Sequence, residues 1–115
     1  MSTQIAINYK NKEYKLEYSR QSVKQMEGNG FVLDQIGDKP MTMIPMLFYG
    51  AFIKNNKGIN RKLVDEIFDR IPNKFDEENG LVTKLIEMYS ETVNTLSTSD
   101  DVDEGNAATW TVVKG

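Results

Sequence analysis

The sequence contains no cysteine and no histidine. Disulfide bonds, thiolate catalysis and cysteine-bound metals are therefore excluded. Without histidine, the chain lacks the commonest metal ligand and the commonest general base at neutral pH. The motifs that bind nucleotide phosphates, activate a serine or hold a catalytic zinc are absent from it as well. Its acidic clusters are interleaved with lysine and arginine, as on solvent-exposed faces. We therefore expect no enzymatic activity, no cofactor and no metal site.

A strong charge of either sign and a long apolar run are also missing. The formal net charge is -3 over 115 residues, which leaves no basic surface for a nucleic acid. The longest apolar stretch, residues 41–53, is shorter than the roughly 20 residues that a membrane-spanning helix needs. The first residues, MSTQIAINYK, have neither the basic nor the apolar part of a signal peptide. We expect a single domain that binds neither nucleic acid nor membrane.

Near the N-terminus, apolar and polar residues alternate on both sides of the turn sequence KNK. This period of two predicts a β-hairpin with one buried face. The side chains of that face are Ile5, Ile7, Tyr9, Tyr14, Leu16 and Tyr18. A short helix is predicted within residues 19–30, with Ser19 or Ser22 as its N-cap.

Two later segments, residues 60–71 and 81–96, carry apolar side chains at helical spacing and predict amphipathic helices. Asn60 is a suitable N-cap for the first of them. With the apolar segment at residues 41–53 as a further helix, the predicted fold is α+β. It consists of an N-terminal β-hairpin packed with a mainly helical bundle of about four helices.

The start of the apolar helix is marked by several candidate residues. Asp38 or Thr42 can cap it, and Pro40 or Pro45 can occupy its first turn, where a proline is tolerated. Gly50 lies inside the helix, where glycine costs about 1 kcal/mol relative to alanine. This glycine either marks a close contact between helices or is simply tolerated.

The apolar helix is also the candidate interaction site. We expect Phe48 and Phe52 to be buried against Leu85 and Tyr89 of the last helix. A domain of about 100 residues buries a limited fraction of its surface, so a helix that is apolar on all sides is hard to enclose. An exposed apolar patch is therefore expected to remain for a partner. Its predicted residues are Met41, Met43, Met46 and Tyr49, with Trp110 as a separate candidate near the C-terminus.

The composition changes after residue 96. Residues 1–96 contain 13 basic and 13 acidic side chains, whereas residues 97–115 contain four acidic side chains and one lysine. We therefore predict a single α+β domain over residues 1–96, followed by a flexible, disordered acidic tail over residues 97–115. The tail ends in TWTVVKG, which includes the only tryptophan. Residues 107–115 could form a docking strand for a partner, or fold back onto the hairpin.

One larger pattern covers residues 13–97, where LEYSRQSVKQMEGNGF is followed by DKPMTMIPMLFYGAF and by two amphipathic helices. The arrangement resembles the small tail assembly chaperones of long-tailed bacteriophages, above all those of phages and prophages of Gram-positive bacteria. The matching positions are Arg20, Val23, Lys24, Met26, Glu27, Gly30 and Phe31, followed by Pro40, Thr42, Pro45, Phe48, Gly50 and Phe52.

This resemblance implies a non-catalytic role in the host cytoplasm. Such a chaperone binds the long, apolar tape-measure protein and keeps it soluble before the tail assembles. A longer product of ribosomal frameshifting would recruit tail tube subunits. The same apolar surface could also hold a second copy of the chain, forming a homo-oligomer.

Two other classes of protein fit a small chain without catalytic residues. One is a structural tail protein, such as a completion component. The other is an acidic inhibitor that mimics DNA. The mimic is disfavoured because it needs acidic groups at fixed spacing, whereas the charges of residues 1–96 balance.

Overall fold

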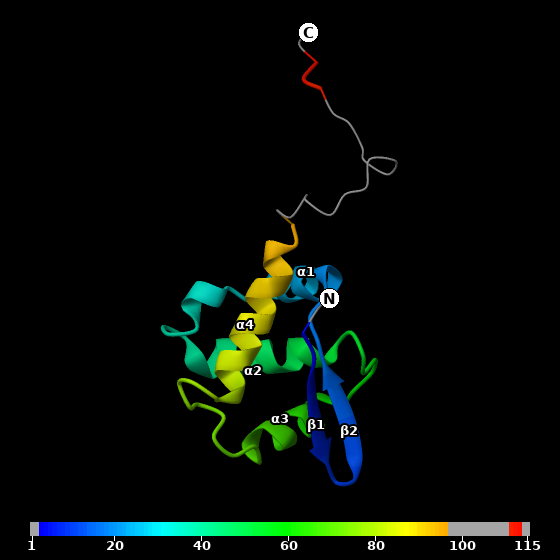
Figure 1. Ribbon diagram of the computed structural model, residues 1–115, viewed down its shortest axis with the longest axis vertical. Helices are drawn as coiled ribbons and strands as arrows, with labels where there is room; N and C mark the ends of the chain where they lie inside the picture. Colours follow the sequence, from blue (N-terminus) through cyan, green and yellow to red (C-terminus); the bar gives the residue numbers. More distant parts are fainter. Residues whose placement is uncertain (1–2, 97–110, 114–115) are drawn as a thin grey trace.

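The computed structural model describes residues 3–96 and 111–113 and has the predicted α+β architecture (Figure 1). A two-stranded antiparallel hairpin precedes four α-helices and one short 3-10 helix in this part of the chain. The elements are β1 (Ile5–Tyr9), β2 (Lys12–Leu16), α1 (Arg20–Gly28), η1 (Leu33–Gln35), α2 (Pro40–Phe52), α3 (Arg61–Asp69) and α4 (Leu81–Asn94).

A two-residue turn sets the register of the hairpin. Lys10 and Asn11 both have positive φ, 49° and 67°, as the type I′ turn between twisted strands requires. The register pairs Ile5 with Leu16 and Ile7 with Tyr14. These opposed side chains share one face that packs on the helices. The predicted burial of this face is confirmed on β2, while Ile5 and Ile7 of β1 are only half-buried.

The helix starts agree only in part with the predicted caps. Ser19 and Ser22 form a reciprocal capping box on α1, and the Asn60 side chain accepts from the Lys62 N–H at 2.8 Å on α3. The predicted caps of α2 are wrong. Its N-cap is Lys39, whose side chain makes no capping bond, and Pro40 is the first helical residue. The fixed φ of proline at this position favours the helical start without a side-chain cap.

Because α2 begins at Pro40, Pro45 lies inside the helix rather than in its first turn. Its nitrogen cannot donate to the carbonyl of Met41. The missing bond lies at the solvent-facing start of the helix, since the Met41 side chain is 90% exposed.

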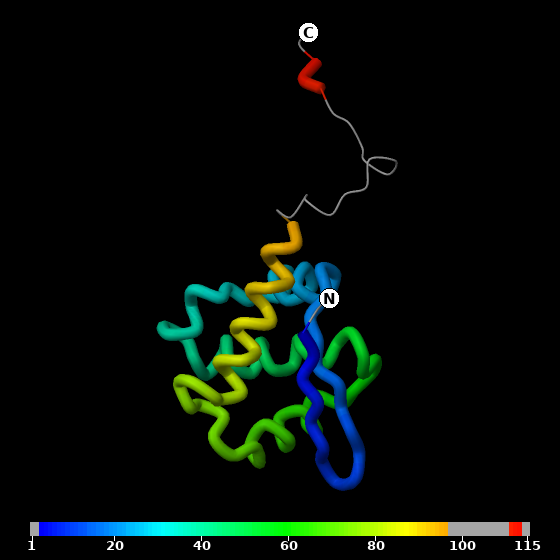
Figure 2. Tube along the Cα trace, in the orientation of Figure 1, coloured from blue at the N-terminus to red at the C-terminus, as the bar shows by residue number. Residues whose placement is uncertain are grey.

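The core is built around α2. This helix contacts α1, α3, α4, β2 and η1, and Figure 2 shows it crossing the middle of the domain with α4 running across it. Leu47, Ala51 and Phe52 of α2 are completely buried. The hairpin contributes Leu16 and α4 contributes Leu85, and both side chains are completely buried.

The predicted burial of Phe48 and Phe52 is confirmed, with exposed fractions of 1% and 0%. Of the predicted neighbours, Leu85 lies in the same core, whereas the Tyr89 ring packs on Tyr18 and Phe31. The ring contacts of the two phenylalanines were not predicted. Phe48 packs on Phe68 of α3, with ring centroids 5.1 Å apart, and Phe52 packs on Tyr14 of β2 at 6.0 Å. The two phenylalanines therefore join α2 to both a helix and the hairpin.

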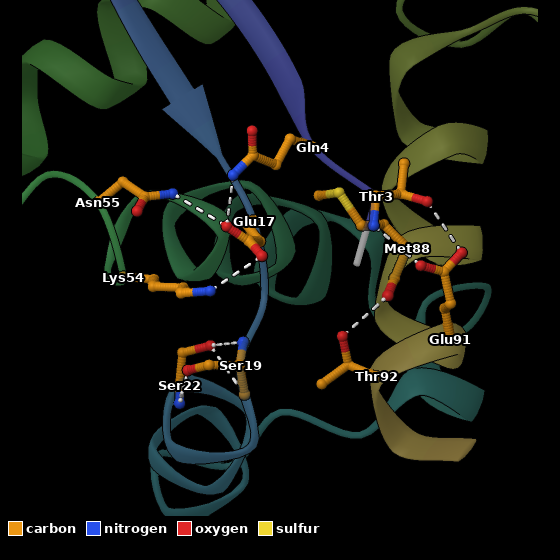
Figure 3. Close-up of polar contacts among 10 residues, drawn as sticks. All are labelled: Thr3, Gln4, Glu17, Ser19, Ser22, Lys54, Asn55, Met88, Glu91 and Thr92. Carbon is orange, nitrogen blue, oxygen red and sulfur yellow. Dashed lines mark hydrogen bonds and ion pairs between the residues drawn. The ribbon is translucent and has the colours of Figure 1, made fainter. Parts of the chain in front are cut away.

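A buried carboxylate links the hairpin to the end of α2 (Figure 3). Glu17 is 3% exposed. It accepts from the Gln4 amide at 2.8 Å and from the Asn55 amide at 3.4 Å, and pairs with the Lys54 ammonium at 2.9 Å. The Glu17 N–H also donates to the Ala51 carbonyl at 2.9 Å. Because a buried charge is costly without partners, this network holds β2 in one position on α2.

The predictions for the C-terminal tail lie mostly outside the described residues. This applies to the acidic segment and to Trp110. Residues 111–113 are described; they are exposed and belong to no strand. Among the described residues the sheet has two strands, so these three residues do not extend it within the chain.

Truncation of Phe52 tests the α2-centred core. We expect Phe52→Ala to lower the free energy of unfolding by about 3–5 kcal/mol, because its ring is fully buried. Phe75→Ala is the matched control, since Phe75 is 60% exposed and a surface change of this kind costs about 0.5 kcal/mol. Urea unfolding of both variants provides the measurement. Equal stabilities of the two variants would contradict this description of the core.

The buried hydroxyl of Tyr18 predicts a loss of stability in alkali. It donates to the Leu47 carbonyl oxygen at 2.5 Å, and burial, with a smaller contribution from Tyr89, raises the pKa of Tyr18 well above its ordinary value. The unfolded chain ionises this tyrosine near pH 10, where the folded chain still holds the proton. Stability should therefore be intact below about pH 10 and fall as the pH rises further.

The variant Tyr18→Phe separates the two effects. We expect it to lose about 1 kcal/mol at neutral pH, the hydrogen bond to Leu47. Its stability should then fall less steeply above pH 10 than that of the wild type, without becoming flat, because burial also raises the pKa of Tyr89. Urea unfolding at pH 8 and pH 11 measures both differences. Identical slopes for the two proteins would show that Tyr18 does not cause the decline.

Candidate partner-binding surface

The predicted patch is divided between the surface and the core. Met41 is 90% exposed, and Met46 and Tyr49 are half-buried. The prediction is wrong for Met43, which is 4% exposed and whose sulfur accepts from the Val32 N–H at 3.5 Å. Met43 lies on the face of α2 that meets η1, whereas Met41 lies on another face two residues earlier. The structure therefore places Met43 in the core, and Trp110 lies outside the described residues.

Helical spacing explains which side chains of α2 remain accessible. Met43, Leu47 and Ala51 are four residues apart and form a buried stripe. Met41, Pro45 and Tyr49 are also four apart and form a second stripe that solvent reaches. We call this stripe, with its half-buried neighbours and Phe75, the α2 surface. Its members are Met41, Ile44, Pro45, Met46, Tyr49 and Phe75.

Two hollows flank the exposed stripe. Each is lined by Met41 and Pro45 of α2 and by Arg61 of α3. The hollow towards α3, of about 430 Å³, is walled by Phe48, Phe68 and Phe75, among others. The hollow towards α1, of about 450 Å³, is lined by side chains that include Met26, Met46, Tyr49 and Ile53. The stripe is therefore a ridge between two largely apolar depressions, a shape that suits apolar side chains of a partner.

Cationic side chains lie over the aromatic rings of this surface. The Arg61 guanidinium carbon is 4.6 Å from the centre of the Tyr49 ring. The Lys74 ammonium is 4.8 Å from the Phe68 ring centre and donates to the Phe68 carbonyl at 2.9 Å. These contacts hold the rings at the edges of the hollows.

Sequence reasoning missed the residues that α3 and the following loop contribute. Neither Phe68 nor Phe75 is among the residues predicted for the surface. The available signal was an isolated aromatic, Phe75, in the polar stretch NKFDEEN. Nothing in the local pattern indicates that Arg61 reaches Tyr49, twelve residues away.

Acidic side chains border the α3 hollow. Asp65 and Asp69 are exposed and line it, and no ion pair involves either carboxylate within the described residues. Glu66 of α3, by contrast, has partners on the hairpin. Its carboxylate accepts a hydrogen bond from the Tyr9 hydroxyl and forms an ion pair with the Lys10 ammonium at 3.4 Å. The Tyr9 hydrogen bond and the charge of Lys10 lower the pKa of the Glu66 carboxyl, and the same bond raises the pKa of Tyr9.

The family model described as Domain of unknown function (DUF5055) matches residues 1–113. The chain belongs to the DUF5055 family. The match includes the hairpin, all the described helices and residues 111–113. No curated protein and no solved structure matches this DUF5055 chain.

Two further properties of this DUF5055 domain bear on its sites. None of its described helices has the length and apolar character needed to cross a membrane. Its described residues also contain no cluster of three or more acidic side chains that could hold a metal ion. The α2 surface is the feature of the described chain in which exposed aromatic and methionine side chains come together.

Gly50 of α2 lies against Met26 of α1, so the predicted close contact between helices is confirmed. A Cβ at this position would lie 2.3 Å from the sulfur of Met26 and 2.8 Å from its Cγ. Met26 is itself buried, with 3% exposure. The helices therefore approach closely because residue 50 has no side chain.

Substitution of Gly50 by alanine tests this contact. Alanine gains about 1 kcal/mol of helix propensity, but the overlap with buried Met26 should outweigh it, at about 1–3 kcal/mol. Gly28→Ala is the control, because a Cβ there meets nothing within 4 Å. Adding Met26→Ala to Gly50→Ala should cost less than the sum of the single changes. A Gly50→Ala variant as stable as the wild type in urea would disprove the close contact.

Proposed function

We propose that this DUF5055 protein is a phage tail assembly chaperone. In this role it binds the tape-measure protein in the host cytoplasm, keeps it soluble and assists assembly of the tail tube. A longer frameshifted product would recruit the tube subunits. The proposal rests on the resemblance over residues 13–97 and on one structural observation, the α2 surface.

The α2 surface suits a chaperone for an apolar helical partner. Exposed Met41 and Phe75 are separated by a hollow large enough for several side chains. A partner helix that carries apolar residues three and four positions apart can place them in two such hollows. Methionine adapts to different partner side chains because it is unbranched and polarizable. A long, apolar partner requires this kind of tolerance.

The acidic side chains beside the hollow towards α3 favour a partner that carries basic residues. Asp65 and Asp69 lie beside the apolar floor and have no ion-pair partner among the described residues. A lysine or arginine that flanks the apolar positions of the partner would face these carboxylates. Such border pairs contribute more to orientation and to the rate of association than to affinity.

Co-expression with the tape-measure protein of the same phage tests the proposal. The wild type should raise the fraction of tape-measure protein in the soluble extract. Met41→Asp combined with Phe75→Asp should abolish this effect and weaken the complex at least tenfold, about 1.4 kcal/mol. Both side chains are exposed, so the variant should remain folded. Leu96→Asp is the matched control, because Leu96 is 75% exposed but lies just beyond the end of α4 and does not belong to the α2 surface.

The outcomes distinguish an error in the proposed binding site from an error in the proposed function. If the folded double variant still solubilises the tape-measure protein, the α2 surface is not where it binds. If the wild type has no effect on the tape-measure protein, the chaperone function is wrong. A complex with assembled tail instead would favour a completion component.

A further inference from the structure

The two edges of the hairpin differ. In a hairpin closed by a two-residue turn, Tyr9 and Lys12 exchange hydrogen bonds, and every second pair beyond them does the same. The backbone groups of the intervening residues point away from the partner strand. On β1 these residues are Ala6 and Asn8, and on β2 they are Glu13 and Lys15.

The outer edge of β2 is occupied at its C-terminal end. The Lys15 carbonyl accepts from the Asn56 side chain at 2.9 Å, and the Glu17 N–H donates to the Ala51 carbonyl at 2.9 Å. The end of α2 and the segment that follows it therefore cover the C-terminal part of this edge. On β1, by contrast, no hydrogen bond from elsewhere in the described chain reaches the backbone of Ala6 or Asn8.

The open edge of β1 lacks the features that normally prevent strand pairing. Such edges are usually protected by charged residues, proline or a bulge. The sequence of β1, IAINY, contains no charged residue and no proline, and its register with β2 is continuous. The charged residues of the hairpin are instead in the turn and on β2.

The apolar face beside this edge is incompletely covered. Tyr14 and Leu16 of β2 are 5% and 0% exposed, whereas their cross-strand partners Ile7 and Ile5 are only half-buried. A third strand beyond β1 would pair with the outward backbone groups. Its alternate side chains would also cover Ile5 and Ile7.

The chain contains a segment of matching character. Residues 109–113 read TWTVV, which is β-branched or aromatic throughout and uncharged. Residues 111–113 are exposed and in no strand, with Val112 and Val113 at 73% and 88%. The DUF5055 match also runs through residue 113. The chain thus contains both an unpaired strand edge, on β1, and a segment suited to pair with it. Neither is paired in this way within the described residues.

We propose that residues 109–113 of one copy add to the outer edge of β1 in a second copy, as a third strand. This site is separate from the α2 surface and does not depend on the proposed function. The occupant is a second copy because the chain itself carries the complementary segment, and residues 111–113 belong to no strand of the described chain.

Chain geometry allows two copies to exchange these segments reciprocally. Thr3, just before β1, bonds through its N–H and its hydroxyl to the carboxylate of Glu91 in α4, both at 3.0 Å. The chain passes Leu96 five residues later, so the C-terminal segment departs from the end of the domain where β1 begins. The twelve residues 97–108 have a small, polar and acidic composition, and such a linker spans roughly 20 Å. A strand of five residues is about 17 Å long, so the linker can reach a neighbouring edge.

Two proline variants block the two halves of the interaction. Ala6→Pro removes an outward N–H that the hairpin does not use, which an edge strand tolerates. Ala6→Ser is its control. Val112→Pro with Val113→Pro removes two consecutive N–H groups, one of which must face β1 in any register. Val112→Ile with Val113→Ile is the control, and these residues lie outside the folded elements, so neither change can unfold the domain.

Sedimentation velocity over a range of concentrations provides the readout, supported by hydrogen exchange at Asn8. The wild type and both controls should form dimers as concentration rises, with the Asn8 amide protected in the dimer. Each proline variant alone should remain monomeric, with fast Asn8 exchange. An equimolar mixture of the two proline variants should form a dimer again, because one supplies an intact segment and the other an intact edge. The mixed dimer should be weaker than the wild-type dimer, since it has one contact instead of two.

Three results would overturn the proposal. The first is a wild type that is monomeric at all concentrations with an unprotected Asn8 amide. The second is a dimer that persists in the Val112→Pro, Val113→Pro variant. The third is a monomeric wild type in which Asn8 is protected and the proline pair removes the protection, because the segment would then bind its own β1. The α2-surface variants leave this assay unchanged, so its failure and that of the chaperone function are distinguishable.

Discussion

α2 is apolar over most of its circumference, and the need to remove it from water organises the domain. The other three helices, η1 and β2 all contact it. Leu47, Ala51 and Phe52 are completely enclosed as a result. The absence of a side chain at Gly50 lets α1 approach, and the Glu17 network holds the hairpin against the end of the helix. Each of the other elements covers one part of the apolar surface of α2.

A domain of this size does not supply enough cover for the whole helix. Small domains bury a smaller fraction of their surface than large ones, and the first turns of α2 are where enclosure fails. Met41 is almost fully exposed there, and Pro45 leaves a carbonyl of the helix without its usual partner. Phe75 and the cation-bearing residues Arg61 and Lys74 border this region without closing it. The α2 surface therefore exists because the neighbouring elements do not extend over the first turns of this apolar helix.

The hairpin is incomplete in a different way. Its inner face is buried at β2 but only half-buried at β1, and the outward backbone groups of β1 point away from β2. The α2 surface offers apolar side chains, whereas the β1 edge offers backbone donors and acceptors. The two surfaces suit different kinds of partner, an amphipathic helix for the first and an extended strand for the second. The two surfaces have no residue in common, so a partner on one would leave the other accessible.

The sequence by itself determined the features that depend on neighbouring residues. The period of two on either side of Lys10 and Asn11 determined the hairpin, and the capping residues Ser19 and Asn60 determined where two helices begin. The burial of Phe48 and Phe52 followed from the composition of one segment. Each of these depends on local backbone preference or on apolar content, which a single stretch of chain contains.

Only the tertiary structure decided which apolar residues are exposed. Met41 and Met43 are two residues apart and chemically identical, yet one is 90% and the other 4% exposed. The difference arises because α2 begins at Pro40 and meets η1 on one face, so the rotation of the helix against distant elements assigns each position. The same holds for the contact of Arg61 with Tyr49 and for the half-buried state of Ile5 and Ile7. Local sequence does not encode these arrangements, because they depend on how segments far apart in the chain pack in three dimensions.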